Sequence, residues 1–522
     1  MRTLPGAGPK LAPARLRLAE MIAAVSLATD LGMGQPMDLA LKVAILGVEL
    51  GRRLGLHPGD LSDIYYLALV RHIGCTSDSV EFAGFSGGDD IAIRRRALVW
   101  PSADPPELLR EILLHVGEGR PSWERAALVA AMLAGGRQRP LQVVAAHCEA
   151  GGRLAERLSL SEGVRAGLVQ EQERWDGKGL PAGLAGPALT IANRVVRVAH
   201  DALVLSATGG NALEIVRRRS ATAYDPDVAA TLLELGRLDL GEESGDAWAA
   251  ALAVEPEPQL TIAAADIDGI ALACGDFVDL KSPWFLGHSA RVAALAVAAA
   301  EALGAEAEET ADLRRAALLH DLGRVGVPNG IWDKPGPLAA SEMERVRLHP
   351  YFTERILARS PLLAPIAVIA GAHHENLDGS GYHRGIGAAQ LPRAARLLRA
   401  ADAFEAMSAG RPHRPALSAA DRLRQLREEV AGGRLDAEMV SAVVEASGGG
   451  RLKVRPVRPA GLSEREVEVL RLLVHGRTNA QIAAGLHLSP KTVGHHVQHI
   501  YDKAGVTSRA AAALFAMENG LV

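Results

Sequence analysis

The chain has 522 residues, of which 48% are hydrophobic and 23% are charged, and its net charge is −4. A chain of this length exceeds one hydrophobic core of ordinary size, so several globular domains are expected. The slightly acidic balance excludes a polycation that coats nucleic acid along its whole length, so any contact with DNA must be local. Aromatic residues make up only 4%, while Ala, Leu, Arg and Glu fill long periodic stretches. This composition predicts an all-α fold.

Neither a disulfide framework nor a membrane span is expected. The three cysteines, Cys75, Cys148 and Cys274, are far apart and form no CxxC pair, which also argues against a zinc ribbon. The N-terminal stretch MRTLPGAGPKLAPARLRLAEMI lacks the apolar segment of a signal peptide. The Ala-rich stretch after His288 is interrupted by Arg291 before it reaches the length of a membrane span. We therefore expect a cytoplasmic protein with no membrane partner.

Two stretches rich in Gly, Pro and charged residues interrupt the helical periodicity, and they predict linkers at 241–260 and 447–460. These linkers separate two large regions, residues 1–240 and 261–446, from a small C-terminal region at 461–522.

The two large regions are related by an internal repeat. WDGKGLPAG, which begins at Trp175, resembles LDGSGYHRG, which begins 202 residues later at Leu377. Upstream, YLALVRHIGC resembles RAALLHDLGR at a spacing of 249 residues. The change of spacing places 47 extra residues in the first copy, between Cys75 and His147. A tandem duplication with an insertion explains this pattern.

The C-terminal region has the start and stop signals of four short helices. Capping spacings mark three of the helix starts: Ser463 with Glu466, Thr478 with Gln481, and Ser489 before Pro490. From Arg451 to the end there are ten Lys and Arg against five Asp and Glu, a local positive surplus in an acidic chain. Such a surplus is what attraction to phosphate would require.

The third of these helices has two distinct faces. Val493, Val497 and Ile500 form an apolar stripe that is expected to face a core. The adjacent polar stripe offers hydrogen-bond donors for base edges and phosphates, and it consists of Lys491, Thr492, His495, His496 and His499. Periodicity alone leaves open the alternative of a helical protein-interaction tail with a solvated charged face.

This C-terminal region resembles the LuxR-type helix-turn-helix domain over its whole length. The likeness is carried by LSEREVEVLRLL, the turn with Gly476 and Asn479, QIA, LSPKTVGHHVQHIYDKAGV and Arg509. It implies a recognition helix at about 489–504 and dimeric binding to a two-fold site on double-stranded DNA. It also implies DNA-facing positions at Lys491, Thr492, Val493, His495 and His496.

Residues 276–430 concentrate side chains that bind metal ions. Imidazole and carboxylate groups suit iron, manganese or zinc, and a carboxylate can bridge two such ions. Two ions close together could hold a phosphodiester and activate water, so the pattern predicts phosphoester hydrolysis. A lone histidine here would more often be a packed core residue. A metal site is indicated only by the whole ordered series, which consists of His288, His320, Asp321, His349, His373, His374 and Asp402.

From His288 to about Leu426 this series resembles the HD-GYP branch of the HD phosphohydrolase superfamily. The likeness is carried by GHSARVA, ALLHDLGRVGVP, DKPGPL, RLHP, AHHENLDGSGYHRG and ARLLRAADAFEAMSAGRPHRP. The resemblance implies an all-helical phosphodiesterase, often acting on a cyclic dinucleotide, with a two- or three-metal centre. It implies that all seven residues of the series are metal ligands, that Asp321 bridges the ions, and that Asp321 and Arg324 are catalytic.

Three positions depart from the family pattern. The basic residue after the His-Asp pair, usually lysine, is Arg324, which keeps the charge and can still hold a phosphate. The GYP signature, which in the family belongs to the loop that contacts substrate or partners, reads Gly381-Tyr382-His383. Trp284 stands where three-metal members supply a carboxylate, so we expect two divalent transition-metal ions, with iron or manganese favoured.

The first repeat keeps the apolar pattern of an HD-type helical domain but lacks most of the ligands. Leu39 stands near the place of His288, and His200 replaces Asp402. The other positions that correspond to ligands hold Arg71, His72, His147, Glu171 and Gln172. Because the guanidinium of Arg71 has no lone pair and would repel a dication, we expect no catalytic metal in the first repeat. Dimerisation and ligand sensing both remain open as roles for this repeat.

The sequence therefore predicts tandem HD-type helical domains followed by a four-helix LuxR-type domain. The favoured interpretation is a homodimeric, DNA-binding transcription regulator with a two-metal phosphodiesterase acting on a cyclic dinucleotide or another phosphodiester. The alternative is a non-catalytic HD module that senses a ligand and controls the DNA-binding dimer.

Overall fold

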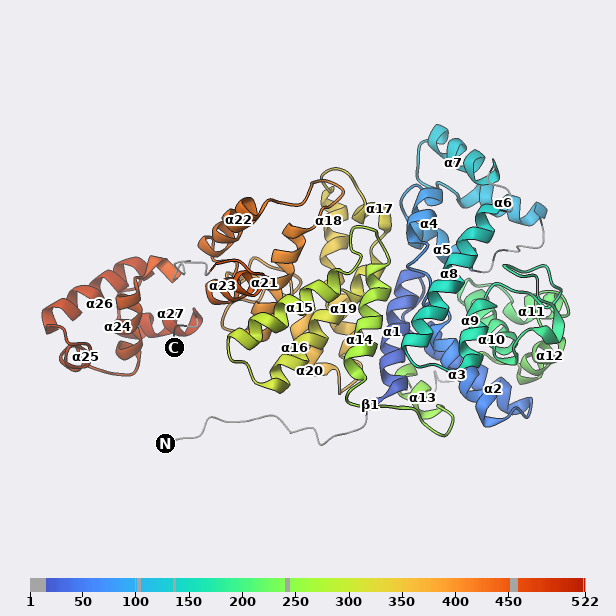
Figure 1. Ribbon diagram of the computed structural model, residues 1–522, viewed down its shortest axis with the longest axis horizontal. Coiled ribbons are helices and arrows are strands. Elements are labelled where there is room, and N and C mark those ends of the chain that lie inside the picture. Colours follow the sequence, from blue (N-terminus) through green and yellow to red (C-terminus); the bar gives the residue numbers. More distant parts are fainter. Residues whose placement is uncertain are drawn as a thin grey trace. The chain divides into compact units, whose positions relative to one another are not determined.

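The computed structural model of the chain describes residues 16–98, 100, 105–134, 138–239, 245–450, 459–519 and 521. Almost all regular structure in these residues is helical (Figure 1). The strands β1 (Leu16–Arg17) and β2 (Thr261–Ile262) pair antiparallel, with Leu16 opposite Ile262. The prediction of an all-α fold is confirmed. None of the described helices is both long and apolar enough to cross a membrane.

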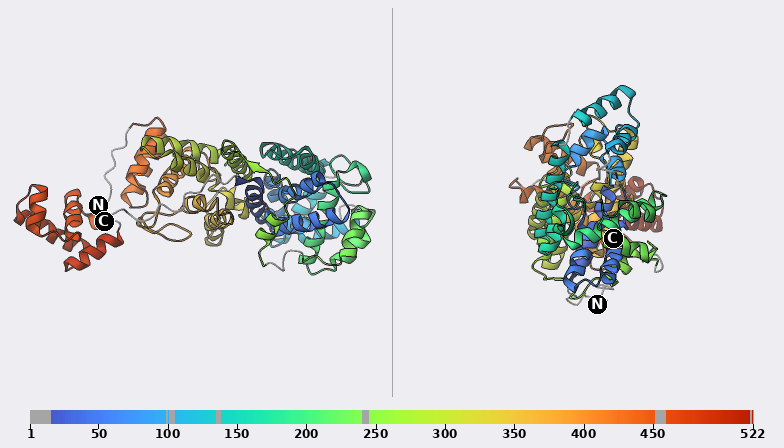
Figure 2. Two further views of the ribbon diagram at one scale, coloured as in Figure 1. Left: turned by 90° about the horizontal axis from the view of Figure 1, so that it is seen from below. Right: turned by 90° about the vertical axis from the view of Figure 1, so that its right-hand side faces the viewer.

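The chain divides into two compact units, Met1–Ala290 with Leu318–Ala367, and Arg291–Ala317 with Val368–Val522. Each is built from short helices (Figure 2). The helices that the first unit takes from the first repeat are α1 (Leu18–Gly32), α2 (Leu39–Arg53), α3 (Pro58–Val70), α4 (Ser79–Ser86), α5 (Asp90–Ala97), α6 (Pro105–His115), α7 (Ser122–Ala134), α8 (Gln138–Arg157), α9 (Glu162–Val169), η1 (Gly186–Ala188), α10 (Ile191–Ala207), α11 (Ala212–Arg219) and α12 (Pro226–Leu235).

The first unit continues into the second repeat. Its later helices are α13 (Ala247–Ala253), α14 (Ile267–Asp279), the start of α15 (His288–Ala302), η3 (Leu322–Gly326), α17 (Asn329–Trp332), α18 (Ala340–Arg347), α19 (His349–Leu357) and the start of α20 (Ala364–Gly371). Helices α2, α3 and α10 pack together at its centre, where Leu46, Leu67 and Val195 are fully buried. Helix α1 packs against both η3 and α19, so the two repeats share one core in this unit.

The second unit holds the rest of the second repeat and the C-terminal region. Its elements are the remainder of α15, α16 (Ala307–Leu319), the end of α20, α21 (Arg393–Ser408), α22 (Ala419–Ala431), α23 (Ala437–Ala446), η4 (Pro459–Gly461), α24 (Glu464–Val474), α25 (Asn479–Leu486), α26 (Pro490–Ala504) and α27 (Arg509–Glu518). Helix α21 packs against α22 and α23, and α24 packs against α25, α26 and α27. The four predicted C-terminal helices are therefore present.

The two repeats form the same buried hydrogen bond at equivalent positions. The Asp30 carboxyl group, near the end of α1, accepts a bond of 2.9 Å from the Ala40 N–H at the start of α2. The Asp279 carboxyl group, at the end of α14, accepts a bond of 2.9 Å from the Ser289 N–H at the start of α15. Both partners are displaced by 249 residues, the spacing found in the sequence. The segment between Cys75 and His147, which carries the extra residues, contains helices α4 to α7.

The stretch predicted as a linker at 241–260 is not simply a linker. Its first four residues lie outside the described part of the chain, but 247–253 form helix α13, on which Trp248 is only 6% exposed. The buried Glu255 carboxylate accepts a hydrogen bond of 2.7 Å from the Tyr66 hydroxyl and pairs with Arg17. The prediction was wrong because two of the charged residues stabilise local structure: Asp246 caps α13 by accepting from the Trp248 N–H at 3.1 Å, and the carboxylate of Glu255 is buried in its ion pair. Most of the other predicted linker, 447–460, lies outside the described residues.

Equivalent glycines let the chain approach itself closely in the two repeats. A Cβ at Gly74 would lie 2.2 Å from the His147 carbonyl oxygen, and one at Gly323 would lie 2.0 Å from that of His349. No side chain fits either position without moving a helix, since these contacts are with backbone atoms. The close approach fixes the turn after α3 against α8, and η3 itself against α19.

We predict that Gly74→Ala lowers the free energy of unfolding by about 1–3 kcal/mol, because an added methyl group overpacks the turn. Gly59→Ala in α3 is a matched control, since nothing lies within 4 Å of the position that its methyl group would take. Urea denaturation of the two variants checks this. Equal stability of the two variants would show that the first repeat does not close on itself as described.

Candidate metal centre and DNA-binding surface

Four of the predicted ligands meet in the first unit around the Asp321 carboxylate. Its Oδ2 atom lies 3.5 Å from His288 Nε2 and 3.0 Å from His320 Nε2, and its Oδ1 atom lies 3.5 Å from His349 Nε2. All four side chains are at most 1% exposed. The sequence brings them together by placing His288 and His349 at the first positions of α15 and α19, beside the turn that carries the His-Asp pair.

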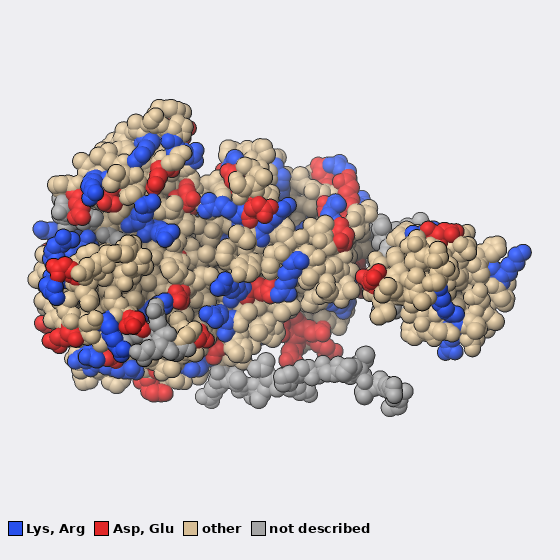
Figure 3. Space-filling model, turned by 180° about the vertical axis from the view of Figure 1, so that it is seen from behind, with Lys and Arg blue, Asp and Glu red and all other residues tan. Residues whose placement is uncertain are grey.

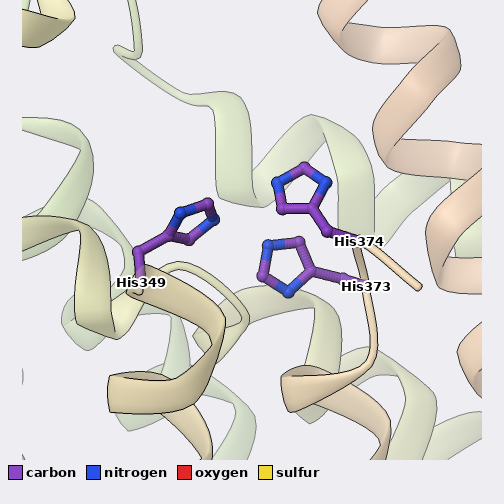
Figure 4. A group of neighbouring side chains, drawn as sticks. All are labelled: His349, His373 and His374. Carbon is purple, nitrogen blue, oxygen red and sulfur yellow. The ribbon is translucent and has the colours of Figure 1, made fainter. Parts of the chain in front are cut away.

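A second group consists of His349, His373 and His374 (Figure 4). One ring nitrogen from each of the three lies within 4.8 Å of the others. His374 Nδ1 also lies 4.0 Å from the Asp402 carboxylate on α21. Each of the seven predicted ligands thus lies near at least one other ligand of the series.

Backbone carbonyls orient two of the imidazoles. His349 Nδ1 donates to the Val346 carbonyl at 2.6 Å, and His373 Nδ1 donates to the Ala370 carbonyl at 2.6 Å. A ring whose Nδ1 carries the proton presents the Nε2 lone pair, which is the form that binds a metal ion. Burial lowers the pKa of His349 to about 4, so the ring is neutral at pH 7.

Asp321 is ionised although it is buried. Burial acts to raise the pKa of this carboxyl group, but the Arg324 guanidinium and the His320 imidazole hold it well below its usual range. Thr353 fixes the turn that carries the carboxylate, because its hydroxyl donates to the His320 carbonyl at 2.8 Å and accepts from the Gly323 N–H at 2.9 Å. The donor set combines a carboxylate with imidazoles, which fits divalent transition metals.

Arg324 is held by two aromatic rings as well as by its ion pair with Asp321. Its guanidinium carbon lies 3.9 Å from the Phe285 ring centre and 5.3 Å from the Trp332 ring centre, within the range of cation–π attraction. The Trp332 indole N–H donates to the Arg324 carbonyl at 3.3 Å. Sequence reasoning found Arg324 but missed both rings, since the contact depends on the turn before α15 and on the short helix α17.

The altered GYP loop is anchored by a buried acid. Glu375 Oε1 accepts hydrogen bonds from the Arg384 N–H at 2.6 Å and the Gly385 N–H at 3.2 Å. The Tyr382 ring lies 4.9 Å from the His374 ring, centre to centre. The loop therefore keeps contact with a predicted ligand although histidine follows Tyr382.

The first repeat fills the equivalent region with its own ion pairs. His147 lies between two carboxylates, with Nδ1 3.1 Å from Asp78 and Nε2 2.9 Å from Glu171. Carboxylates only accept, so both ring nitrogens donate and no lone pair remains for a metal ion. Burial acts to lower the pKa of His147, but Glu171 and Asp78 raise it to about 10. Arg71 is buried next to Glu171 and donates to its carbonyl at 3.3 Å.

Two further imidazoles complete this buried cluster. His72 Nδ1 lies 3.0 Å from Glu171, His200 Nδ1 lies 2.9 Å from Asp201, and the two Nε2 atoms lie 3.1 Å apart. The two rings lie edge to face with their centres 5.0 Å apart, and burial lowers the pKa of both. Asp201 could have been found from its place beside His200. Asp78 could not, because it lies beyond the point where the repeats align.

The C-terminal region has its core and its polar surface on separate faces of α26. Val493 and Ile500 are fully buried with residues of α24, α25 and α27, and both predicted capping boxes are formed. Val493 was expected among the DNA-facing positions, and this is wrong: its side chain belongs to the core. The other predicted positions lie on the surface, with His496 half-buried and the rest exposed: Lys491, Thr492, His495 and His499.

Basic and acidic side chains are interspersed on the face of the molecule drawn in Figure 3. Such mixing agrees with the small net charge of the chain. Attraction to a phosphate backbone would therefore have to come from a local surface such as that of α26.

Comparison with known proteins gives the family of both regions. A family model described as "HD domain" matches residues 138–228 and 273–439. A second, "Bacterial regulatory proteins, luxR family", matches residues 460–516. A 3'3'-cGAMP-specific phosphodiesterase (number 3) of Vibrio cholerae is 31% identical over 435 residues, which cover 82% of this chain and 94% of that protein.

The chain belongs to the HD-GYP-type phosphodiesterase family. A crystal structure of a cyclic GMP-AMP specific phosphodiesterase from V. cholerae superposes with a TM-score of 0.58 at 28% identity and covers 83% of this chain and 98% of that one. A cyclic di-GMP phosphodiesterase of Thermotoga maritima is 36% identical over 160 residues, 30% of this chain and 43% of that protein. The sequence-based assignment to an HD-GYP-type region followed by a LuxR-type domain is confirmed.

We predict that the first repeat of this HD-GYP-type protein loses stability as the pH rises from about 7 to 10. The pKa of His147 is about 10 in the folded chain, against about 6.5 for an unperturbed histidine. A raised pKa gives stability that is complete below the unfolded value and is lost as the pH rises through the folded value.

Urea midpoints measured across this range check the prediction. His147→Gln, which cannot be protonated, should flatten the decline, whereas the exposed His57→Gln should keep the wild-type profile. Parallel profiles of wild type and His147→Gln would contradict a charged imidazole in this cluster.

Proposed function

We propose that the second repeat is a metal-dependent phosphodiesterase whose ligands are the seven residues of the predicted series. The observation that carries this proposal is the buried Asp321 carboxylate within 3.5 Å of three imidazole nitrogens. A carboxylate in this position is suited to bridge two divalent ions, and iron or manganese fits the mixed donor set. Such ions would supply Lewis acidity toward the phosphoryl group and lower the pKa of water.

The chain's own residues would bind and orient the substrate. Arg324 keeps a positive charge beside the ligands, and its Nε and Nη1 atoms make no hydrogen bond to other described residues. These donors suit a phosphate oxygen. Phe285 and Trp332 hold the guanidinium plane by cation–π contact, so little conformational entropy is lost when it binds.

For the substrate class we propose a cyclic dinucleotide. The support is that relatives over most of this chain, and over its second repeat, are named as phosphodiesterases of 3'3'-cGAMP and of cyclic di-GMP. The C-terminal domain would bind double-stranded DNA as part of a homodimer, which makes the whole protein a transcription regulator. Coupling would follow if the substrate or its product binds the DNA-competent and incompetent states unequally.

Purified full-length protein, loaded with manganese or iron under anaerobic conditions, tests the proposal with a panel of cyclic dinucleotides. Metal-dependent formation of linear products would support it. Metal binding with saturable dinucleotide binding and no product would favour the alternative of a non-catalytic sensor. Absence of both metal and nucleotide binding would refute both.

Asp321→Ala should remove bound metal and lower the rate of hydrolysis by roughly 100-fold or more, because a bridging carboxylate neutralises two cations. Metal content by elemental analysis and product formation by chromatography measure this. Glu344→Ala, an exposed acid on α18, is the control and should retain both. Wild-type activity in Asp321→Ala would show that the chemistry lies elsewhere.

Lys491→Ala and His495→Ala should each weaken DNA binding roughly tenfold, since both side chains lie off the buried stripe and face solvent. Lys491→Ala should also reduce the salt-dependence slope by about one, as expected for one lost phosphate contact. Electrophoretic mobility shifts on DNA selected from genomic fragments measure both. Arg427→Ala, which removes the same charge from α22, should bind like wild type, and an equal loss there would argue against a surface on α26.

A further inference from the structure

The inserted helices of the first repeat place a buried carboxylate inside the second repeat. Asp90, the first residue of α5, is fully buried. Its Oδ2 atom accepts a hydrogen bond of 3.0 Å from Lys281 Nζ, and its Oδ1 atom accepts one of 2.7 Å from the Asn329 N–H. Lys281 is only 1% exposed, so this is a buried ion pair between segments about 190 residues apart.

The backbone beside this ion pair is equally close. The Gly330 N–H donates to the Gly88 carbonyl at 2.9 Å, and a Cβ at Gly330 would lie 2.5 Å from atoms of Gly88. The turn between α4 and α5 therefore docks directly on α17, where no side chain larger than hydrogen fits. This contact gives a structural role to part of the 47-residue insertion.

Asp90 bonds to two segments, and each of them carries an aromatic ring that contacts Arg324. Lys281 begins the turn that carries Phe285 and ends at His288, and the Phe285 ring lies 3.9 Å from the guanidinium. Asn329 begins α17, whose Trp332 lies 5.3 Å from the same guanidinium and bonds the Arg324 carbonyl.

A side-chain network closes the gap between the two segments. Asn329 Nδ2 donates to Asp333 at 2.7 Å, and the Ser282 hydroxyl donates to the other oxygen of Asp333 at 2.6 Å. Arg324 in turn pairs with Asp321. One carboxylate of the first repeat thus joins the two segments of the second repeat whose rings, Phe285 and Trp332, contact Arg324.

We propose that Asp90 is a positioning residue for the metal centre. It acts on Arg324, and through Arg324 on Asp321, by holding the two segments that carry Phe285 and Trp332. The role rests on the proposed function of the second repeat. It makes the first repeat an integral part of the catalytic unit and not a separable sensor. Removing the charge of Asp90 would leave the Lys281 ammonium buried without its anion, so the turn that begins at Lys281 would have to move.

Asp90→Asn tests the proposal, because the amide keeps the size and can still accept from the Asn329 N–H. Asp89→Asn is the matched control: it lies one residue away, and its carboxylate pairs at the surface with Arg345, at 3.4 Å. Asp89 Oδ1 also caps α5 by accepting from the Ala92 N–H at 2.9 Å, a bond that the amide oxygen of asparagine can keep. Both variants are studied as full-length protein, with folding verified by circular dichroism.

Hydrogen exchange of the metal-free protein is the first readout. Asp90→Asn should speed amide exchange in residues 281–288 and 322–333, while Asp89→Asn should leave it unchanged. Unchanged exchange in Asp90→Asn would overturn the positioning role whether or not the protein hydrolyses any substrate.

Kinetics with manganese and a cyclic dinucleotide are the second readout. Asp90→Asn should lower kcat about 10- to 100-fold, the range found for groups that hold metal ligands in place, with KM changed less than about twofold. Wild-type kcat in Asp90→Asn would contradict the proposal. An inactive, metal-free wild type would refute the proposed function itself, and the exchange result would still decide the role of Asp90.

Discussion

The structure of the second repeat depends on one buried carboxylate. An ionised Asp321 is unfavourable in a protein interior unless cations or hydrogen-bond donors surround it. The guanidinium of Arg324 and the imidazoles of His288 and His320 supply that environment. Thr353 and Gly323 fix the turn from which the carboxylate projects. The positions of α15, η3 and α19 are constrained by the need to bring these partners within reach of a single side chain.

The first repeat shows how the same scaffold is stabilised without such a centre. Its turn after α3 approaches α8 as closely as the equivalent turn approaches α19. The difference lies in where the imidazoles donate: His349 donates to a backbone carbonyl and keeps a lone pair, while His147 donates to carboxylates through both nitrogens. Ion pairs within the first repeat take the place of the charges that metal ions would bring to the second.

Much of the fold and site followed from local sequence patterns. Ligand order, the spacing of the repeats and the capping boxes are local features, and the structure places Ser463 and Thr478 at helix starts as predicted. Contacts between distant segments left no such pattern. Neither the burial of Trp248 nor the pairing of Asp90 with Lys281 could be read from neighbouring residues, because each depends on the packing of helices far apart in the chain.

We propose that the second repeat holds metal through the seven-residue series, while the first repeat is closed by internal ion pairs. X-ray diffraction from crystals of manganese-loaded protein, collected at the metal absorption edge, tests it most directly. We expect about two anomalous peaks beside Asp321 and none near His147. A peak bounded by His72, His147, Glu171 and His200, or the absence of any peak beside Asp321, would contradict it.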